Sequence, residues 1–401
     1  MLSPATLATS VAVLASSVQA ASSTYIKYST VTGYFLQDVP TTNASTFDYT
    51  ATNFGLINRT YPATDGLSAD LTQWQRFERQ VEALNAAADL NTVYKVLFMG
   101  RHGEGFHNAA ETYYGTPAWN CYWAELNGNG TVTWADADLT VNGIAQAQKA
   151  NNFWKHELAI QHIPAPQSYY VSPLTRCLRT ANITFSGLEL PIYYPFVPTI
   201  KELFREGISI HTCDHRRNKT YIHDLFPTWN FEKGFKENDD YWNGVTAETS
   251  AAQDVRSKKV LDSVFTSDDH TWLSITSHSG EIGSILRVLG HQTFSLSTGA
   301  VIPVLVKGRN PEFLSASDAP AATSAPYTTS THCSSPPLSS ISGVGQGCVC
   351  SSGVNVTTPL ITLSSAPTSC TATSSKRKHT HITVTTAAYS HHTSNTYGYH
   401  S

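Results

Sequence analysis

The chain has 401 residues, of which 41% are hydrophobic and only 14% are charged, with a formal net charge of −4. About a quarter of the residues in a typical globular protein are charged, so this surface must be largely neutral and polar. The slight negative charge argues against a nucleic-acid-binding protein, which needs basic side chains to neutralise phosphates, and no stretch after residue 20 approaches the roughly 20 apolar residues of a membrane span.

Residues 1–20 are predicted to be a secretory signal peptide. They contain no charged side chain, carry an apolar core from Leu7 to Leu14, and end in the small-residue cleavage pattern Val18-Gln19-Ala20. An ordinary N-terminal segment is the alternative. Six glycosylation sequons support a secreted, extracellular glycoprotein, since such sites imply surface loops. They lie at Asn43, Asn58, Asn129, Asn182, Asn218 and Asn355.

From residue 71 onward, predicted helices and strands alternate. A helix is expected over 71–84, where Trp74, Phe77, Val81 and Leu84 recur at helical spacing. The elements that follow are a strand at 93–99, a helix at 140–158, a strand at 169–171, a helix at 174–183, a strand at 272–276, a helix at 281–289 stopped by Gly290, and a strand at 300–306. This order predicts an α/β fold, a three-layer α/β/α sandwich with a mainly parallel sheet. Two aromatic-rich interruptions, 109–135 and 211–244, are expected to be functional loops over the active site.

Arginine and histidine residues follow three of the predicted strands. Arg101 and His102 come after the first of these strands, Arg176 after the second and His278 after the third. Ligands of open α/β sheets bind outside the carboxyl ends of the strands, so these side chains should meet at one edge. One Arg-His-Gly tripeptide could arise by chance, but core packing does not explain the convergence of all three segments, because arginine is rarely buried without a partner.

On these residues the sequence resembles the histidine phosphatase (phosphoglycerate mutase-like) superfamily, in the branch of phosphoglycerate mutases and small phosphomonoesterases, over about 93–306. The segments that carry the resemblance are Arg101-His102-Gly103-Glu104 with Asn108, Leu139-Thr140 with Gly143 and Gln146-Ala147, Ser172 with Arg176 and Thr180, and His278-Ser279-Gly280. Ser279 departs from the usual His-Gly form. Gly105, Phe106 and Asn108 replace the further arginine and the proline of the phytase-like branch, which argues against that branch.

The resemblance implies a phosphohistidine mechanism without a metal or another cofactor. His102 would attack phosphorus, and Arg101, Arg176, Asn108 and His278 would hold the phosphoryl oxygens. Arginine suits this task because its planar guanidinium is permanently charged. Fixed positive charge around the equatorial oxygens is most of what phosphoryl transfer requires.

A carboxylic acid must protonate the departing alkoxide. The family places this glutamate after the second arginine motif, where Glu202 and Glu206 are the candidates. We favour Glu206, because Gly207 and the segment 211–214 follow it as an active-site loop would. The alternative is a surface ion pair between Glu206 and Arg205. Glu104 is interpreted as a residue that shapes its loop.

Two further groups of residues have open roles. Six aromatic residues of the first interruption could line a leaving-group pocket, although packing is the favoured interpretation for most of them: Tyr113, Tyr114, Trp119, Tyr122, Trp123 and Trp134. His211, His215, Arg216 and Arg217 could recognise a second anionic group or could form a solvated basic loop.

The catalytic domain is expected to span 21–314 and a disordered tail 315–401. The tail is rich in Ser, Thr and Pro and has only four charged residues: Asp318, Lys376, Arg377 and Lys378. It has too few large apolar residues to build a core. Its composition favours O-glycosylation and an association with a cell wall, and its polar, His-rich end argues against a GPI anchor.

The seven cysteines divide between the two regions. Cys121, Cys177 and Cys213 lie in the catalytic domain, and Cys333, Cys348, Cys350 and Cys370 lie in the tail. An oxidising compartment favours disulfides, and the four tail cysteines could form two bridges in any of three connectivities. The odd set of three leaves at least one free thiol or one bond outside its own region. Cys348-Val349-Cys350 is too tight for a zinc site.

The leading hypothesis is a secreted phosphatase that hydrolyses small phosphomonoesters. A phosphoglycerate mutase is the first alternative, although its glycolytic substrate is absent outside the cell. A non-catalytic wall or adhesion protein on a phosphatase fold is the second, and the intact Arg and His residues argue against it. Sugar phosphates, nucleotides, phytate and phosphopeptides all remain candidate substrates.

Overall fold

A computed structural model describes residues 25–64, 70–310, 327–330, 332–337, 339–340, 348–350 and 355–356. The predicted signal peptide and most of the predicted tail lie outside these residues. The chain divides into two compact units, 1–361 and 362–401, and every described residue belongs to the first. No described helix is both long and apolar enough to cross a membrane.

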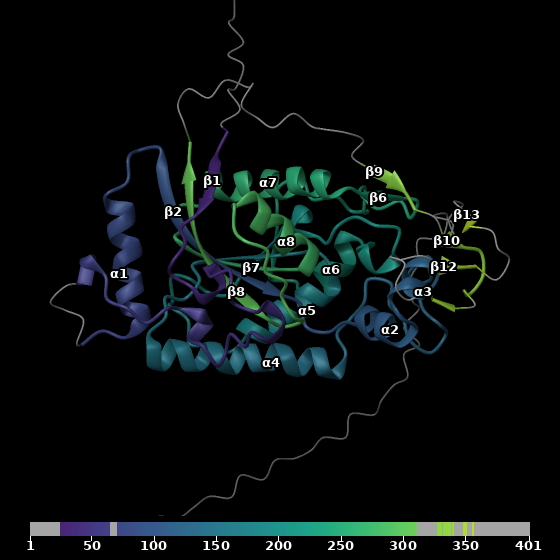
Figure 1. The fold of residues 1–401 in the computed structure, drawn as a ribbon, viewed down its shortest axis with the longest axis horizontal. Coiled ribbons are helices and arrows are strands. Elements are labelled where there is room, and N and C mark those ends of the chain that lie inside the picture. Colours follow the sequence, from purple (N-terminus) through teal and green to yellow (C-terminus); the bar gives the residue numbers. More distant parts are fainter. Residues whose placement is uncertain are drawn as a thin grey trace, which may run out of the picture. The chain divides into compact units, whose positions relative to one another are not determined.

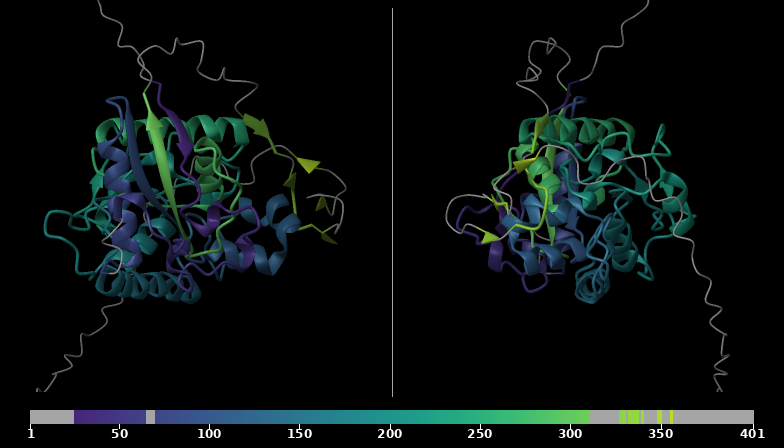
Figure 2. Two further views of the ribbon diagram at one scale, coloured as in Figure 1. Left: turned by 60° about the vertical axis from the view of Figure 1, so that its left-hand side comes forward. Right: turned by 90° about the vertical axis from the view of Figure 1, so that its right-hand side faces the viewer.

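The first unit is built on a seven-stranded sheet with the order β1-β8-β2-β7-β3-β4-β5. The strands from β2 to β5 in this order are parallel, whereas β8 and β1 are antiparallel to their neighbours. These two strands lie beside β2 at one side of the sheet (Figure 2). The strand bounds are β1 Lys27–Thr30, β2 Thr92–Arg101, β3 Ser168–Val171, β4 Thr199–Ile200, β5 Asn230–Phe231, β7 Trp272–Ser277 and β8 Val301–Arg309. The mainly parallel sheet confirms the prediction.

Helices cover both faces of the sheet. Successive strand residues point to opposite faces, and the central strands carry apolar side chains on each face. Leu97 and Met99 of β2 pack in the same cluster as residues of α7 (Ser250–Ser267) and α8 (Ser279–Val288). Val96 and Phe98 pack on the opposite face with α1 (Gln73–Ala86), α4 (Val141–His156) and α5 (Thr175–Phe185). Figure 1 shows α7 and α4 on opposite sides of the sheet. The three-layer architecture is therefore confirmed.

Local signals fix the ends of the predicted helices within two residues of their predicted positions. Thr140 is the N-cap of α4 and accepts a hydrogen bond from the backbone N–H of Gly143 at 3.1 Å. Gly290 follows α8 with a φ of +67°, which suits glycine at a helix end. Helix α5 starts at Thr175, one residue later than predicted. Its first turn is held by buried Asp136, whose carboxylate accepts bonds from Thr175 N and Oγ1 at 2.9 and 2.6 Å.

The first interruption forms short helices rather than a loop. We call residues 106–137 the aromatic insertion. It contains α2 (Phe106–Tyr114), α3 (Thr116–Cys121) and the 3₁₀ turn η5 (Trp123–Glu125) around buried Trp119 and Trp134. The second interruption contains η8 (Thr212–Asp214), α6 (Lys219–Leu225) and β5. Packing is thus the role of most aromatic residues named above, and Tyr113, which is 82% exposed, is an exception.

The remaining elements are short. They are η1 Leu36–Asp38, η2 Ala44–Thr46, η3 Asn53–Gly55, η4 Pro62–Thr64, η6 Glu157–Gln161, η7 Glu202–Phe204 and β6 Thr246–Glu248 before residue 310, then β9 Tyr327–Thr329, β10 His332–Cys333, β11 Ser339–Ser340, β12 Cys348–Val349 and β13 Asn355–Val356.

The described part of the tail packs on the residues before 310, which its composition did not predict. Strand β9 pairs with β6, and β10, β11 and β12 contact α3 of the aromatic insertion. Cys333 and Cys350 form a disulfide, and Cys121 is also disulfide-bonded. Cys121 packs against Cys333 and Cys350, whereas Cys177 and Cys213 are buried free thiols. One predicted bridge within the tail is therefore present, and Cys121 of the insertion takes part in a further disulfide.

Candidate active site

The predicted nucleophile follows the last residue of β2 and is almost completely buried. The backbone N–H of His102 bonds to the carbonyl of Ser277 on the neighbouring strand at 3.0 Å, which fixes the loop at the carboxyl edge of the sheet. The imidazole Nδ1 lies 2.7 Å from the carbonyl of Gly103 and therefore carries the proton in that bond. Nε2 is left with its lone pair. Burial, with Arg176 and Arg101 next in effect, holds the pKa of His102 well below its ordinary value, so the ring is neutral.

Arg176 and His278 meet beside this histidine. The Arg176 Nε–H donates to Nδ1 of His278 at 3.2 Å, and the two imidazole rings of His278 and His102 are 5.1 Å apart. Because Nδ1 of His278 accepts, its Nε2 carries the proton and donates to Ser172 Oγ at 2.7 Å. The other Arg176 nitrogens donate to the carbonyl of Cys213 at 2.6 Å and to Asp214 at 3.3 Å. A fully buried guanidinium thus connects three segments at the sheet edge.

The loop after β2 is shaped by close backbone approaches. A Cβ at Gly103 would lie 2.3 Å from the carbonyl oxygen of Gly143, so only glycine fits where the loop meets α4. The Glu104 carboxylate accepts from Thr140 Oγ1 at 2.6 Å, which agrees with a loop-shaping role. Arg101 donates from Nη1 to the carbonyl of Leu296 at 2.7 Å, while its buried Nε has no hydrogen-bond partner among the described residues.

The first turn of α2 brings two more polar side chains to the loop. Asn108 accepts a bond from the Gly105 N–H at 3.0 Å through Oδ1, which leaves its amide nitrogen as a donor. His107 was not predicted. Its ring lies 5.4 Å from that of His102, it is 8% exposed, and its Nδ1 has no partner among the described residues. Its place just before Asn108, on the helix that follows the catalytic loop, is the sequence signal that could have found it.

Glu206 sits at the N-terminus of α8. Its carboxylate accepts from the backbone N–H groups of Gly207 at 2.9 Å, Glu281 at 3.0 Å and Gly280 at 3.2 Å. A Cβ at Gly280 would lie 2.3 Å from Glu206 Oε1, so the glycine of the second histidine motif makes room for this carboxylate. Burial, followed by the charge of Asp214, raises the pKa of Glu206 above its ordinary value. A carboxyl group beside the His278 motif can therefore hold a proton.

Glu202 is placed differently. It is buried and pairs with Arg205 at 3.2 Å and with Arg216 at 2.8 Å. Arg205 also binds both carboxylate oxygens of Asp239 at 2.6 Å, so the alternative pair between Arg205 and Glu206 is not formed. Arg216 is engaged in the buried interior, which removes it from the proposed anion-binding group. The structure thus favours Glu206 over Glu202 as the free carboxyl group of the site.

One group of described residues has metal-ligand atoms close together, namely His211, Cys213 and Asp214, whose ligand atoms lie within 4.8 Å of one another. Arg176 donates to Asp214, and its fixed positive charge opposes a cation at this position. Burial also raises the pKa of the Cys213 thiol far above its ordinary value, whereas a metal ligand must be a thiolate. The chemistry of this donor set does not support a metal centre.

Comparisons with known proteins agree with this arrangement. Residues 97–298 match the family model of the histidine phosphatase superfamily (branch 1). The chain is 51% identical over 284 residues to a "Probable phosphoglycerate mutase" of Arthroderma benhamiae, with 70% of this chain and 84% of that protein covered. It is 35% identical to "Phosphomutase-like protein 3" of Candida albicans, with 71% and 81% covered. Among solved structures, the phosphoglycerate mutase of Thermus thermophilus is 20% identical, with 52% of this chain and 91% of that chain covered and a TM-score of 0.29.

The match to the family model spans the predicted site residues from Arg101 to His278. The chain therefore belongs to the histidine phosphatase superfamily.

Proposed function

We propose that this protein is a secreted phosphatase that hydrolyses small phosphomonoesters through a phosphohistidine on His102. The observation that carries the proposal is the state of His102. Its Nδ1 is held by the Gly103 carbonyl, its ring is neutral, and Nε2 keeps a lone pair beside Arg176 and Arg101. An imidazole in this state is a nucleophile surrounded by the positive charge that a phosphoryl group requires.

In the first step, His102 Nε2 attacks phosphorus and the bond to the ester oxygen breaks. Arg101, Arg176 and the Asn108 amide hold the phosphoryl oxygens, and His278 adds a donor when substrate replaces Ser172 as its partner. The departing alkoxide takes the proton of Glu206. In the second step, Glu206 accepts a proton from water, the water oxygen attacks phosphorus, and the bond to His102 breaks with release of phosphate.

Phosphoglycerate mutase-type transfer is the second candidate, favoured by the names of the relatives. The two reactions share the phosphohistidine and differ in the acceptor, which is water in one and a phosphoglycerate hydroxyl in the other. The deciding experiment supplies purified protein with a panel of phosphomonoesters and, separately, with 3-phosphoglycerate. We expect phosphate release across the panel without interconversion of phosphoglycerates. Interconversion that outpaces phosphate release would assign the mutase reaction, and the absence of both would favour the non-catalytic alternative.

Secretion is proposed on the sequence pattern and on the positions of the sequons. Asn43, Asn58, Asn129 and Asn218 are exposed, so a glycan could be attached at each without unfolding. Asn43 and Asn218 use Oδ1 to cap a helix, which leaves the amide nitrogen free for attachment. Expression from the natural leader should deliver the protein to the medium, with a mass that falls after N-glycosidase treatment. Binding to isolated cell walls by the full chain, but not by a chain ending at Asn310, would support the proposed wall association of the tail.

A further inference from the structure

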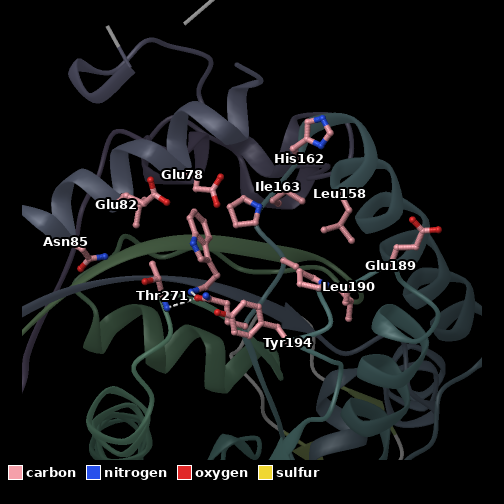
Figure 3. A pocket seen from close by; sticks show the side chains of 16 residues that line it. Glu78, Glu82, Asn85, Leu158, His162, Ile163, Glu189, Leu190, Tyr194 and Thr271 are labelled. Carbon is pink, nitrogen blue, oxygen red and sulfur yellow. Dashed lines mark hydrogen bonds between the residues drawn. The ribbon is translucent and has the colours of Figure 1, made fainter. Parts of the chain in front are cut away.

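A groove of about 900 Å³ lies at the edge of the sheet opposite to the active site (Figure 3). Thr271 and Trp272, at the start of β7, and Gln167, just before β3, line it. His102 and His278 follow the other ends of the strands β2 and β7. The groove is therefore separate from the chemistry, and its size is in the range of ligand-binding clefts.

The lining of the groove combines apolar side chains with a similar share of polar ones. Trp272 and Ile163 are buried, and Leu158, Leu190 and Tyr194 are partly exposed around them. These side chains come from β7, from the segment after α4 and from the segment after α5. Such a surface favours a ligand that contributes apolar groups of its own.

Three carboxylates surround this apolar surface. Figure 3 shows Glu78 and Glu82 on α1 at one side of the groove and Glu189 at the other. None of the three forms an ion pair within the part of the chain that the structure describes, whereas the buried Glu202 and Glu281 are paired with arginine. No lysine or arginine lines the groove, and His162 is exposed at its rim. Burial and then the charge of Glu82 raise the pKa of Glu78.

An exposed apolar turn adjoins the groove. The N–H of Tyr194 bonds to the carbonyl of Pro191 at 2.9 Å, and both of these residues line the groove. The two residues between them, Ile192 and Tyr193, are each 85% exposed. Two consecutive, large apolar side chains at the tip of a turn extend the contact surface beyond the space that a small cation would fill.

We infer that this groove docks a segment of a partner protein in which lysine or arginine alternates with apolar residues. The cationic heads would lie between Glu78, Glu82 and Glu189, and the apolar side chains would pack on Trp272 and on the 191–194 turn. The same carboxylates repel nucleic acids, phosphorylated ligands and anionic membranes. A docked partner would leave the catalytic edge open, so the surface could hold the enzyme near a substrate-bearing protein without blocking turnover.

The test is a fluorescence-anisotropy titration of the full chain with a short labelled peptide in which leucine and lysine alternate. We expect micromolar binding that weakens as salt rises, because exposed ion pairs are screened. The triple variant Glu78→Gln, Glu82→Gln and Glu189→Gln should bind at least tenfold more weakly. Ile192→Ser with Tyr193→Ser should weaken binding severalfold. Phosphatase activity should stay within twofold of wild type in both variants, because neither touches the catalytic edge.

The matched control is Asp224→Asn, Asp240→Asn and Asp269→Asn, which removes the same charge from exposed carboxylates outside the groove. This control should bind the peptide like wild type. Equal loss of binding in both triple variants would show attraction by net charge alone and would overturn the proposal. The absence of binding to wild type would also overturn it. A further outcome would assign the groove to a small cation instead. In that case spermine displaces the peptide with an affinity equal to that of the peptide, and Ile192→Ser with Tyr193→Ser does not weaken peptide binding.

Discussion

The catalytic edge of the sheet and the aromatic insertion beside it are held together in different ways. At the edge, polar side chains bond to backbone groups of neighbouring strands and helices, as Arg176 does with Cys213 and Glu206 does with α8. In the insertion, buried aromatic rings pack on one another, and Cys121 of α3 packs on the Cys333–Cys350 disulfide of the tail. The side chains of the site are thus held in position by hydrogen bonds to the backbone of helices and strands. The insertion is instead stabilised by aromatic packing and by disulfides.

The largest expected effect tests whether the edge serves chemistry rather than stability. His102→Ala should lower kcat/KM by roughly 10³-fold or more, because the covalent step is lost. Its melting temperature should fall by a few degrees at most, because the buried imidazole leaves a small space on removal but bonds only to the adjacent carbonyl. Activity and differential scanning fluorimetry measure the two effects. His223→Ala, an exposed histidine on α6, is the control. Activity within tenfold of wild type would contradict the nucleophile assignment.

The next effect tests the acid. Glu206→Gln should slow hydrolysis of alkyl phosphates by roughly 10²-fold or more and slow that of an activated aryl phosphate much less, because a stable anion leaves without a proton. The matched control is Glu78→Gln on the opposite edge, which should leave both rates unchanged. Glu202→Gln should instead destabilise the protein by about 3–5 kcal/mol, because it breaks a buried ion pair with Arg205 and Arg216. If Glu202→Gln shows the leaving-group effect instead, Glu202 is the acid.

The same residue gives a pH signature. Glu206 must be protonated to act, and its pKa is raised by burial and by Asp214, so activity should persist above the ordinary range of a glutamate and fall as pH rises through the raised pKa. His102 must be neutral, and its pKa is lowered, so protonation of the nucleophile removes activity only at a pH well below the ordinary histidine range. A pH profile of kcat/KM should keep its high-pH limb in wild type and lose it in Glu206→Gln.

Substitutions of buried aromatic residues in the insertion should lower the free energy of unfolding. Trp134 is fully buried among aromatic rings, so Trp134→Ala should cost about 3–5 kcal/mol. Tyr113→Ala, on the 82%-exposed side chain, should cost less than about 0.5 kcal/mol. Urea denaturation of both variants gives the comparison. Equal values for the two would show that the rings do not form a packed cluster.

The smallest effect concerns the tail. Cys333→Ser with Cys350→Ser opens a loop with a sequence separation of 17, so it should cost about 3 kcal/mol locally and expose the insertion to protease. A chain ending at Asn310 should behave similarly, because it also removes β9 and the tail strands that contact α3. Limited proteolysis and melting temperature are the measurements. An unchanged cleavage pattern in both would show that the tail contacts do not stabilise the insertion.

Much of the fold was predictable because hydrophobic periodicity and caps agree with tertiary packing. Thr140 marks the start of α4, and Gly290 marks the end of α8, as the sequence indicates. The start of α5 was less predictable, since buried Asp136 from a distant segment sets it. Strands β4 and β5 have two residues each, which is too short to show the alternation of apolar and polar residues that marks a strand. Only their pairing in the sheet beside β3 defines them.

The site was predictable where it depends on residues that follow strands, and less so where it depends on long-range fit. The sequence places His102, Arg176 and His278 at one edge, and the structure brings them together. The choice between Glu202 and Glu206 rests on contacts with Arg216 and α8 that no local pattern contains. The tail strands were missed because composition describes the ability to build a core, whereas these strands attach to a core that already exists.

The buried Arg176 has a consequence for related chains that have lost their activity. It connects α5, the Cys213–Asp214 segment and the His278 loop, so its removal would leave the buried Asp214 carboxylate without this ion pair and the Cys213 carbonyl without this donor. Selection for folding alone would therefore preserve this arginine long after catalysis had ceased. The His102 side chain bonds only within its own loop and could drift as soon as turnover no longer mattered. In related chains, a histidine at the position of His102 would therefore indicate retained activity, whereas an arginine at the position of Arg176 would indicate only a retained fold.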